Sequence, residues 1–186
     1  MWVRDVSELE WNVVVSTHAE GYRAARAALR DFGRVWRTDY FNVLVMKVDD
    51  IASFLEDMSR LAAINPRLMK EVARIAPAAA AFDFESAPEF ERKLHEAALS
   101  RIAELAGKSF HSRMHRRGLR QVISSRDEEQ SLNRALLDAL ASAGTPGSLD
   151  FTDPDAIVAV ETVGHRAGVS LWSRDDLRKY PFLKAD

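Results

Sequence analysis

The first half of the chain alternates between short apolar runs and longer segments whose apolar residues have a helical spacing. Residues 11–17 are rich in β-branched side chains, which is typical of a buried strand, and residues 42–48 repeat that pattern. Residues 21–32 carry apolar side chains three and four positions apart, which predicts a helix. Residues 35–38 form a further candidate strand. The pattern to this point is therefore strand, helix, strand, strand.

A second helix and a last strand complete this half. A pair of aspartates precedes a predicted helix over residues 51–61, and a further helical piece extends from Asn65 to residue 75. Residues 79–84 are the candidate last strand. The order β-α-β-β-α-β predicts a small ferredoxin-like domain over residues 1–85.

The second half begins with a clear helix signal. Ser86 is followed three residues later by Glu89, which is a capping box and predicts a helix to about residue 106. The following candidates are a strand over residues 108–117, a helix with a second capping box from Ser125, and short strands at 149–151, 157–163 and 169–172. We therefore expect an α/β (α+β) fold, with a second domain over residues 86–186.

Composition excludes several classes of protein. The 186 residues are 47% hydrophobic and 29% charged, which is ordinary for a folded globular chain. No apolar run approaches the roughly 20 residues that cross a bilayer, and the N-terminus lacks the apolar core of a signal peptide. The absence of cysteine rules out thiol catalysis, disulfides and Cys-ligated zinc or iron–sulfur clusters. We expect a cytoplasmic protein with no membrane partner.

The distribution of charge carries more information than the net charge of −2. Residues 108–120 hold five Lys/Arg, two histidines and no acid. In a strand, side chains alternate between the two faces, so Phe110 and Met114 should face the core while His111 and Arg113 share the other face. Such a row of cationic and imidazole groups suits a row of phosphates. The predicted RNA-binding residues are Lys108, His111, Arg113, His115, Arg116, Arg117, Gly118 and Arg120.

An alternative interpretation of this basic strand is a solvated face held by salt bridges within the protein. A metal site is disfavoured, because His111 and His115 are four apart on a strand and have arginine neighbours. The chain also lacks a Gly-x-Ser-x-Gly elbow, a P-loop and a Gly-x-Gly-x-x-Gly loop. We therefore expect no catalytic residues, no metal and no cofactor.

The motifs of the second half, taken in order, resemble the THUMP domain, an RNA-binding module of tRNA-modifying proteins. Phe110, Arg113, Arg116 and Gly118 match its F-x-x-R-x-x-R-x-G strand. A capped helix follows, and residues 149–161 are similar to its V-D-L-x-x-P-D-x-x-V-x-V-E segment. The resemblance covers residues 86–186, and the first half is similar to the ferredoxin-like domain that usually precedes THUMP.

This resemblance implies binding of tRNA around the acceptor stem and 3′ end. Its matching positions for phosphate contact are Arg113, Arg116, Arg117 and Gly118. The chain has neither an Asn/Asp-Pro-Pro-Tyr methyltransferase motif nor a Ser-Gly-Gly-x-Asp-Ser loop. It thus resembles the stand-alone THUMP adaptor that helps an RNA cytidine acetyltransferase act on tRNA.

Our leading hypothesis is that the protein is not an enzyme and presents tRNA to a separate RNA-modifying enzyme. A second hypothesis is a protein-interaction module without independent RNA binding, which the near-neutral net charge favours. A third is a small enzyme that uses His111 or His115.

Overall fold

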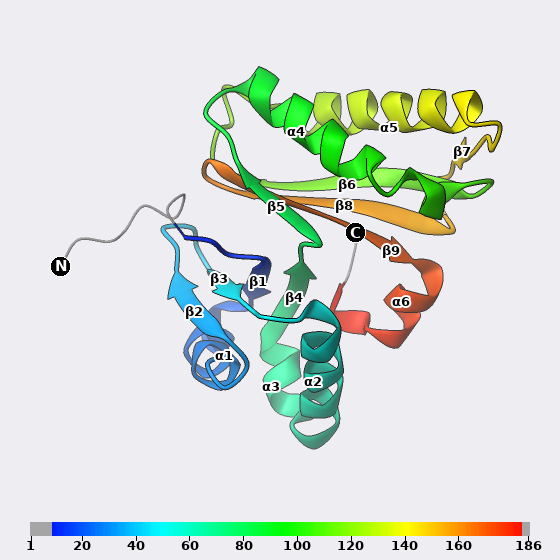
Figure 1. Ribbon diagram of the computed structural model, residues 1–186. Helices are drawn as coiled ribbons and strands as arrows, with labels where there is room; N and C mark the ends of the chain where they lie inside the picture. The colour runs from blue at the N-terminus through cyan, green and yellow to red at the C-terminus, as the bar shows by residue number, and fades with distance from the viewer. Residues whose placement is uncertain (1–8, 184–186) are drawn as a thin grey trace. The chain divides into compact units, whose positions relative to one another are not determined.

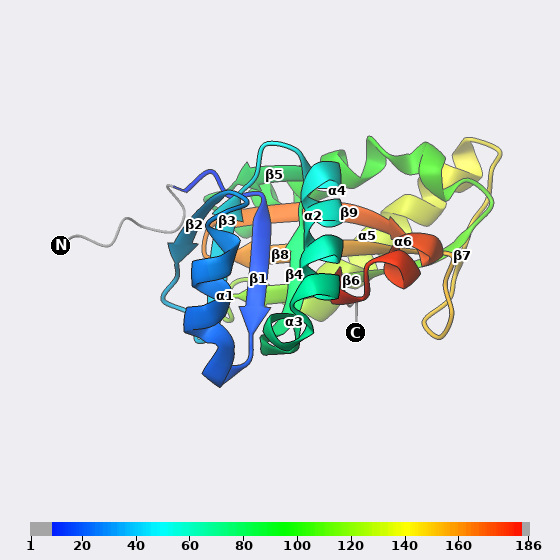
Figure 2. The ribbon, with the colours of Figure 1, turned by 90° about the horizontal axis from the view of Figure 1, so that it is seen from below.

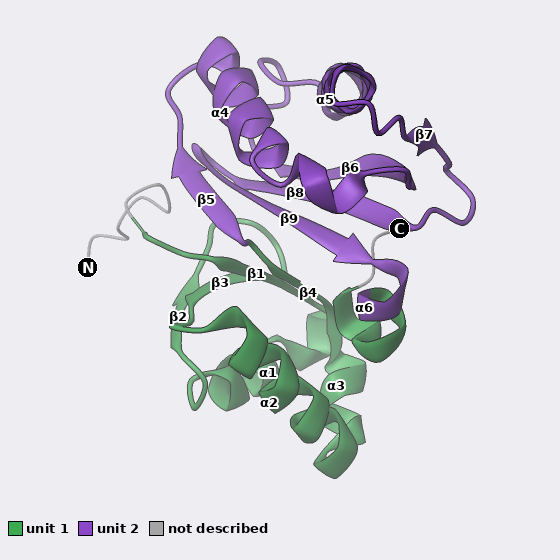
Figure 3. Ribbon diagram, turned by 45° about the vertical axis from the view of Figure 1, so that its right-hand side comes forward, with its two compact units in different colours: residues 1–78, 177–184 green, residues 79–176, 185–186 purple. Residues whose placement is uncertain are grey.

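A computed structural model describes residues 9–183 and divides the chain into two compact units (Figure 3). Among the described residues, the first unit comprises residues 9–78 and 177–183, and the second comprises residues 79–176. The first unit thus ends at residue 78, before the boundary expected at residue 85, and it also includes residues 177–183. Both units combine a sheet with helices, so the α/β fold class expected from the sequence is confirmed.

The first unit contains one four-stranded sheet, in the order β2-β3-β1-β4, whose neighbouring strands are all antiparallel. Its helices lie on one face of that sheet (Figure 1). The elements are β1 (Val13–Thr17), α1 (Tyr22–Leu29), β2 (Arg34–Arg37), β3 (Val43–Lys47), α2 (Ile51–Ile64), α3 (Pro66–Glu71) and β4 (Val72–Pro77).

Capping residues explain where the helices of this unit begin. The Asp50 side chain accepts a hydrogen bond from the backbone N–H of Ser53 at 2.6 Å and caps α2. The Asn65 side chain accepts from Leu68 N at 3.1 Å and caps α3, with Pro66 at the first helical position.

The prediction of a helix as far as residue 75 is wrong beyond Glu71, where α3 ends. Residues 72–77 form strand β4, which pairs with β1, and Val72 and Ile75 are buried there. The apolar spacing of this segment fits a helix, but pairing with the central strand overrides it. The candidate last strand at 79–84 is also present as β5, although it belongs to the second unit.

The second unit contains a five-stranded sheet in the order β5-β9-β8-β6-β7. Strand β6 runs parallel to both β8 and β7, and the remaining neighbours are antiparallel. Helices α4 and α5 cover one face of the sheet (Figures 1 and 2). The elements are β5 (Ala80–Asp83), α4 (Ala87–Leu99), β6 (Ser109–Arg117), α5 (Ser125–Ser142), β7 (Ser148–Leu149), β8 (Ala156–Val163) and β9 (Arg166–Ser173), and α6 (Arg174–Lys179) leads back to the first unit.

Between this sheet and its helices lies a core that includes the fully buried Phe90, Phe110 and Leu136. Ser86 caps α4 by accepting from Glu89 N at 3.3 Å, as the sequence predicts. Helix α5 is capped by Ser124 rather than Ser125. Among residues 9–183, no helix has the length and hydropathy that a membrane span requires.

Candidate nucleic-acid interface

Strand β6 alternates between a buried and a more accessible face, as its sequence predicts. Phe110, Ser112 and Met114 are buried. Between them, His111 is half-buried and Arg113 is exposed. Because the buried side chains belong to the core under α4 and α5, the cationic side chains point to the other face of the sheet.

The outer edge of β6 is covered by side chains of α5. Strand β7 pairs only with Ser109 and Phe110, so no strand within residues 9–183 neighbours the rest of β6 on that side. There the backbone N–H of Ser112 donates to Asn133 Oδ1 at 2.8 Å, and that of Met114 donates to Glu129 Oε1 at 2.6 Å. With these donors satisfied, the edge is closed to an added strand at these positions, and a ligand must be recognised by the side chains of β6.

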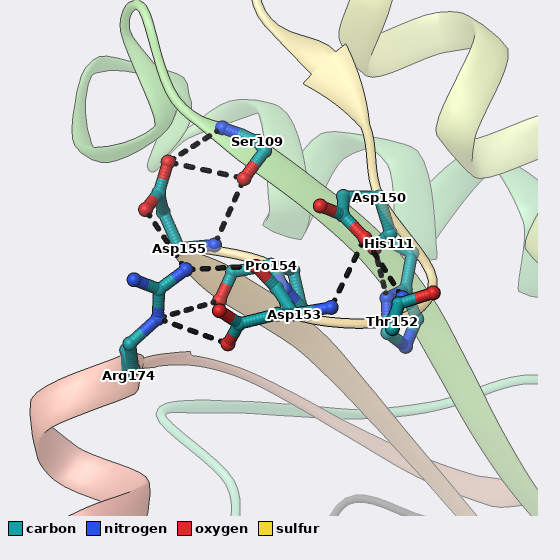
Figure 4. A network of polar contacts seen from close by, with 8 residues as sticks. All are labelled: Ser109, His111, Asp150, Thr152, Asp153, Pro154, Asp155 and Arg174. Atoms are coloured by element: carbon teal, nitrogen blue, oxygen red, sulfur yellow. Dashed lines mark hydrogen bonds and ion pairs between the residues drawn. The ribbon is translucent and has the colours of Figure 1, made fainter.

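A polar network holds the beginning of β6 (Figure 4). The Asp155 carboxylate accepts from both the backbone N–H and the hydroxyl of Ser109, each at 3.0 Å. These hydrogen bonds lower the pKa of Asp155 below its ordinary value. Arg174 lies 3.3 Å from Asp155 and donates to the carbonyl oxygen of Asp153 at 2.7 Å. The loop before β8 is therefore tied to both β6 and the start of α6.

The same loop is closed on itself by Asp150. Its carboxylate accepts from the backbone N–H groups of Thr152 and Asp153 at 2.8 and 3.0 Å, and these bonds lower its pKa (Figure 4). Its carbonyl oxygen lies 2.8 Å from His111 Nδ1, so that ring nitrogen carries a proton. The Pro-Asp motif that resembles THUMP thus belongs to a rigid turn.

This turn presents an aromatic side chain that the sequence did not single out as a site residue. Phe151 is 68% exposed, and its ring stacks on His111 with centroids 5.3 Å apart and an angle of 28°. An exposed phenylalanine beside a basic strand offers a surface on which a nucleobase can stack. The sequence feature that points to Phe151 is its position as one aromatic residue in an otherwise polar loop between two strands.

The far end of β6 differs from the sequence-based expectation. Arg117 forms an ion pair with Glu161 at 2.6 Å, and their side chains are only 15% and 3% exposed. Burial lowers the pKa of Arg117 to about 10, which leaves the guanidinium charged at neutral pH. Arg116 donates to the carbonyl oxygen of Gly118 at 2.7 Å. Both guanidinium groups thus make contacts within the protein, and the ion pair of Arg117 is of the kind that the salt-bridge alternative predicts.

A tight turn follows, in which Gly118 and Leu119 both have positive φ, at 91° and 54°. The left-handed conformation is ordinary for glycine and uncommon for leucine. Arg120 is exposed just beyond this turn, and Lys108 is exposed just before the strand. Of the eight predicted residues, three are therefore exposed: Lys108, Arg113 and Arg120. The other five are partly covered: His111, His115, Arg116, Arg117 and Gly118.

The start of α5 does not add to an anion site. Its first turn contains Asp127 and Glu128. Burial, with the nearby charges of Glu91 and Asp127, raises the pKa of Glu128 to about 7. The carboxylates offset the positive end of the helix dipole. No cluster of three or more possible metal ligands is found among residues 9–183.

Comparison with known proteins gives similar folds only. No protein-family model and no curated protein matches the chain. The solved structures that match include PH1313 from Pyrococcus horikoshii Ot3 (12% identity, TM-score 0.60), TrmN from Thermus thermophilus (18%, 0.58) and a 4-thiouridine synthetase in complex with RNA and ATP (11%, 0.56). They cover 87%, 86% and 88% of this chain, which spans 54%, 44% and 41% of theirs. At these identities the likeness shows a shared fold.

The prediction that the protein is not an enzyme is wrong by this comparison. Besides TrmN, the matching structures include one described as a possible methylase from Clostridium difficile 630 and one described as a predicted N6-adenine-specific DNA methylase from Listeria monocytogenes, each 40% covered by this chain. The 4-thiouridine synthetase and these two structures are thus named for a catalysed reaction.

Proposed function

We propose that the protein binds tRNA through the accessible face of β6 and takes part in tRNA modification. The observation that carries this proposal is the exposed Arg113 next to the stacked rings of His111 and Phe151, on a strand whose ends and edge are held by hydrogen bonds. Two neighbours in fold, TrmN and the RNA-bound 4-thiouridine synthetase, support it, as does the resemblance of residues 86–186 to THUMP.

Each residue type has a distinct part in this proposal. Arg113 and the flanking cations Lys108 and Arg120 contact phosphates, because guanidinium and ammonium groups pair with phosphate oxygens. Phe151 stacks on an unpaired base, with His111 supporting its ring. Unpaired bases occur at the 3′ end of tRNA, next to the acceptor stem that the THUMP resemblance points to.

The arrangement of the first unit fits the same proposal. We propose that this unit is the ferredoxin-like domain expected from the sequence, which its antiparallel strand order β2-β3-β1-β4 and its element order support. We further propose that the two units present tRNA to a separate RNA-modifying enzyme, for which a cytidine acetyltransferase is the candidate. A tRNA ligand agrees with the cytoplasmic location suggested by composition.

The test is binding of labelled bulk tRNA, with duplex DNA of similar length for comparison, at two salt concentrations. Wild-type protein should prefer tRNA and bind it more weakly at high salt. Arg113→Gln should weaken binding and reduce the slope of log affinity against log salt by about 0.7–0.9, the value for one lost phosphate contact. Arg92→Gln is the matched control, because Arg92 is an exposed arginine of the same unit on α4.

Equal tRNA affinity of Arg113→Gln and wild type at both salt concentrations would contradict the site. If wild-type protein bound no tRNA even at low salt, the proposed function would be wrong. The protein-interaction module would then become the better interpretation.

A further inference from the structure

A second cationic feature lies in the first unit, between helix α1 and strand β2, which are neighbours in Figures 1 and 2. It is a cavity of about 260 Å³. Among residues 9–183, no acidic side chain contributes to its wall. The lining residues are Tyr22, Arg23, Arg26, Ala27, Arg30 and Arg37.

The helical repeat explains how three of these arginines come together. Arg23, Arg26 and Arg30 are three and four positions apart, which places them on one face of α1 and its C-terminal end. The fourth, Arg37, is the last residue of β2, and the fold brings it to the same cavity. Strand and helix thus contribute to one wall of positive charge.

Within residues 9–183 the side chains of these arginines have no anionic partner, unlike several other arginines of the chain. Arg60, Arg101 and Arg174, for example, each lie within 3.4 Å of an Asp or Glu oxygen. The side chains of the four cavity arginines make no ion pair and no hydrogen bond within the described part of the chain. The Nε of Arg26 is moreover buried without an acceptor among residues 9–183.

Such an arrangement favours an anion for two reasons. Like charges in one cavity repel one another, and an anion with more than one negative charge relieves that repulsion. A buried N–H group without an acceptor is also unfavourable, and phosphate oxygens are strong acceptors for the guanidinium fork. The hydroxyl of Tyr22 adds a further donor at the wall.

We propose that this cavity is a phosphate-binding site, distinct from the accessible face of β6. Phosphate suits it better than a carboxylate, because several guanidinium groups need more acceptor oxygens and more charge than one carboxylate supplies. The phosphate can belong to an RNA strand or to a small phosphorylated molecule. The site does not depend on the proposed function of the second unit.

The probe is inorganic pyrophosphate, titrated by calorimetry into the full chain. Wild-type protein should bind it and gain thermal stability, because a ligand that binds only the folded state raises the melting temperature. Arg26→Gln should weaken binding by at least about tenfold, as expected for the loss of a charged hydrogen bond. The double variant Arg23→Gln/Arg30→Gln should also bind more weakly. Because both of these side chains are exposed, this variant should fold normally even if Arg26→Gln does not.

Arg60→Gln is the matched control, since Arg60 is an exposed arginine of the same unit outside the cavity. It should bind pyrophosphate like wild type, as should Arg113→Gln, which changes only the β6 site. The inference is overturned if wild-type protein binds no pyrophosphate. It is equally overturned if both cavity variants bind it as wild type does.

A parallel titration with tRNA and with ADP separates the two sources of phosphate. If the cavity variants lose affinity for pyrophosphate and tRNA together, the site takes an RNA phosphate. If they lose pyrophosphate and ADP but keep tRNA binding, it takes a small phosphorylated molecule. Either result supports the site, and neither bears on whether Arg113 contacts RNA.

Discussion

Individual side chains of the β6 region divide into those that can meet a ligand and those that hold the strand. Arg113 and Phe151 are exposed, whereas Arg117 is paired with Glu161 in the interior of the unit. Removing one member of a buried ion pair leaves the other charge uncompensated and destabilises the protein. If substitution of Arg117 abolished RNA binding, the loss would therefore reflect lower stability of the protein as much as a lost contact with RNA.

Phe151 allows a sharper test at this scale. Phe151→Ala should weaken tRNA binding by about 1–3 kcal/mol, the contribution of one base stacked on an aromatic ring. Its melting temperature should stay near that of wild type, because the side chain is 68% exposed. Phe41→Ala is the control, since Phe41 is 85% exposed in the other unit. Unchanged tRNA affinity of Phe151→Ala would exclude the stacking role.

Among the elements, helix α5 contributes more than core packing. Asn133 and Glu129 satisfy the backbone of β6, and the first turn places Glu128 beside other carboxylates. The first of these roles keeps the edge of the sheet closed. The second makes the stability of the protein depend on pH.

The pH dependence follows from the raised pKa of Glu128. Between its ordinary value of 4.5 and about 7, the folded protein binds more protons at this group than the unfolded chain, so stability falls as pH rises through this range. Glu128→Gln should remove that loss and be more stable than wild type by about 1 kcal/mol at pH 8, after allowance for solvent screening.

Denaturant unfolding of both proteins at pH 4 and pH 8 measures this difference. The advantage of Glu128→Gln should nearly disappear at pH 4, where the carboxyl group is mostly protonated in both states. Asp138→Asn, which changes an exposed carboxylate later in α5, is the control. An equal advantage at both pH values would point to a packing effect rather than to ionisation.

On the scale of the whole molecule, the chain returns to its first unit at the end. Residues 177–183 belong with residues 9–78, and Tyr180, Phe182 and Leu183 are buried. Lys179 Nζ and the Tyr180 hydroxyl donate to Glu56 Oε1 on α2, at 2.6 and 2.5 Å. The first unit is therefore complete only when the end of the chain has been added.

Phe182→Ala tests this dependence. Because Phe182 is only 8% exposed, the substitution should lower the free energy of unfolding by about 3–5 kcal/mol, as for other buried phenylalanines. Phe151→Ala, an exposed phenylalanine of the second unit, should leave unfolding nearly unchanged. A denaturation midpoint for Phe182→Ala equal to that of wild type would show that the segment contributes little to the first unit.

Local features of the sequence predicted much of the secondary structure. The strand at 109–117 follows from alternation, and the starts of α2 and α4 follow from their caps at Asp50 and Ser86. Strand β4 was missed because residues 68–75 have helical spacing, while pairing with β1, far away in the chain, sets their conformation.

The sequence by itself determined the α/β class, the basic strand and its two faces, since these depend on neighbouring residues and on the two-residue period of a strand. Only the tertiary structure decided which cations are accessible, because the partner of Arg117 lies 44 residues away and Phe151 reaches His111 through a loop. The same holds for the arginine cavity: the arginines of α1 are visible in the sequence, but Arg37, seven residues beyond Arg30, joins them only through folding.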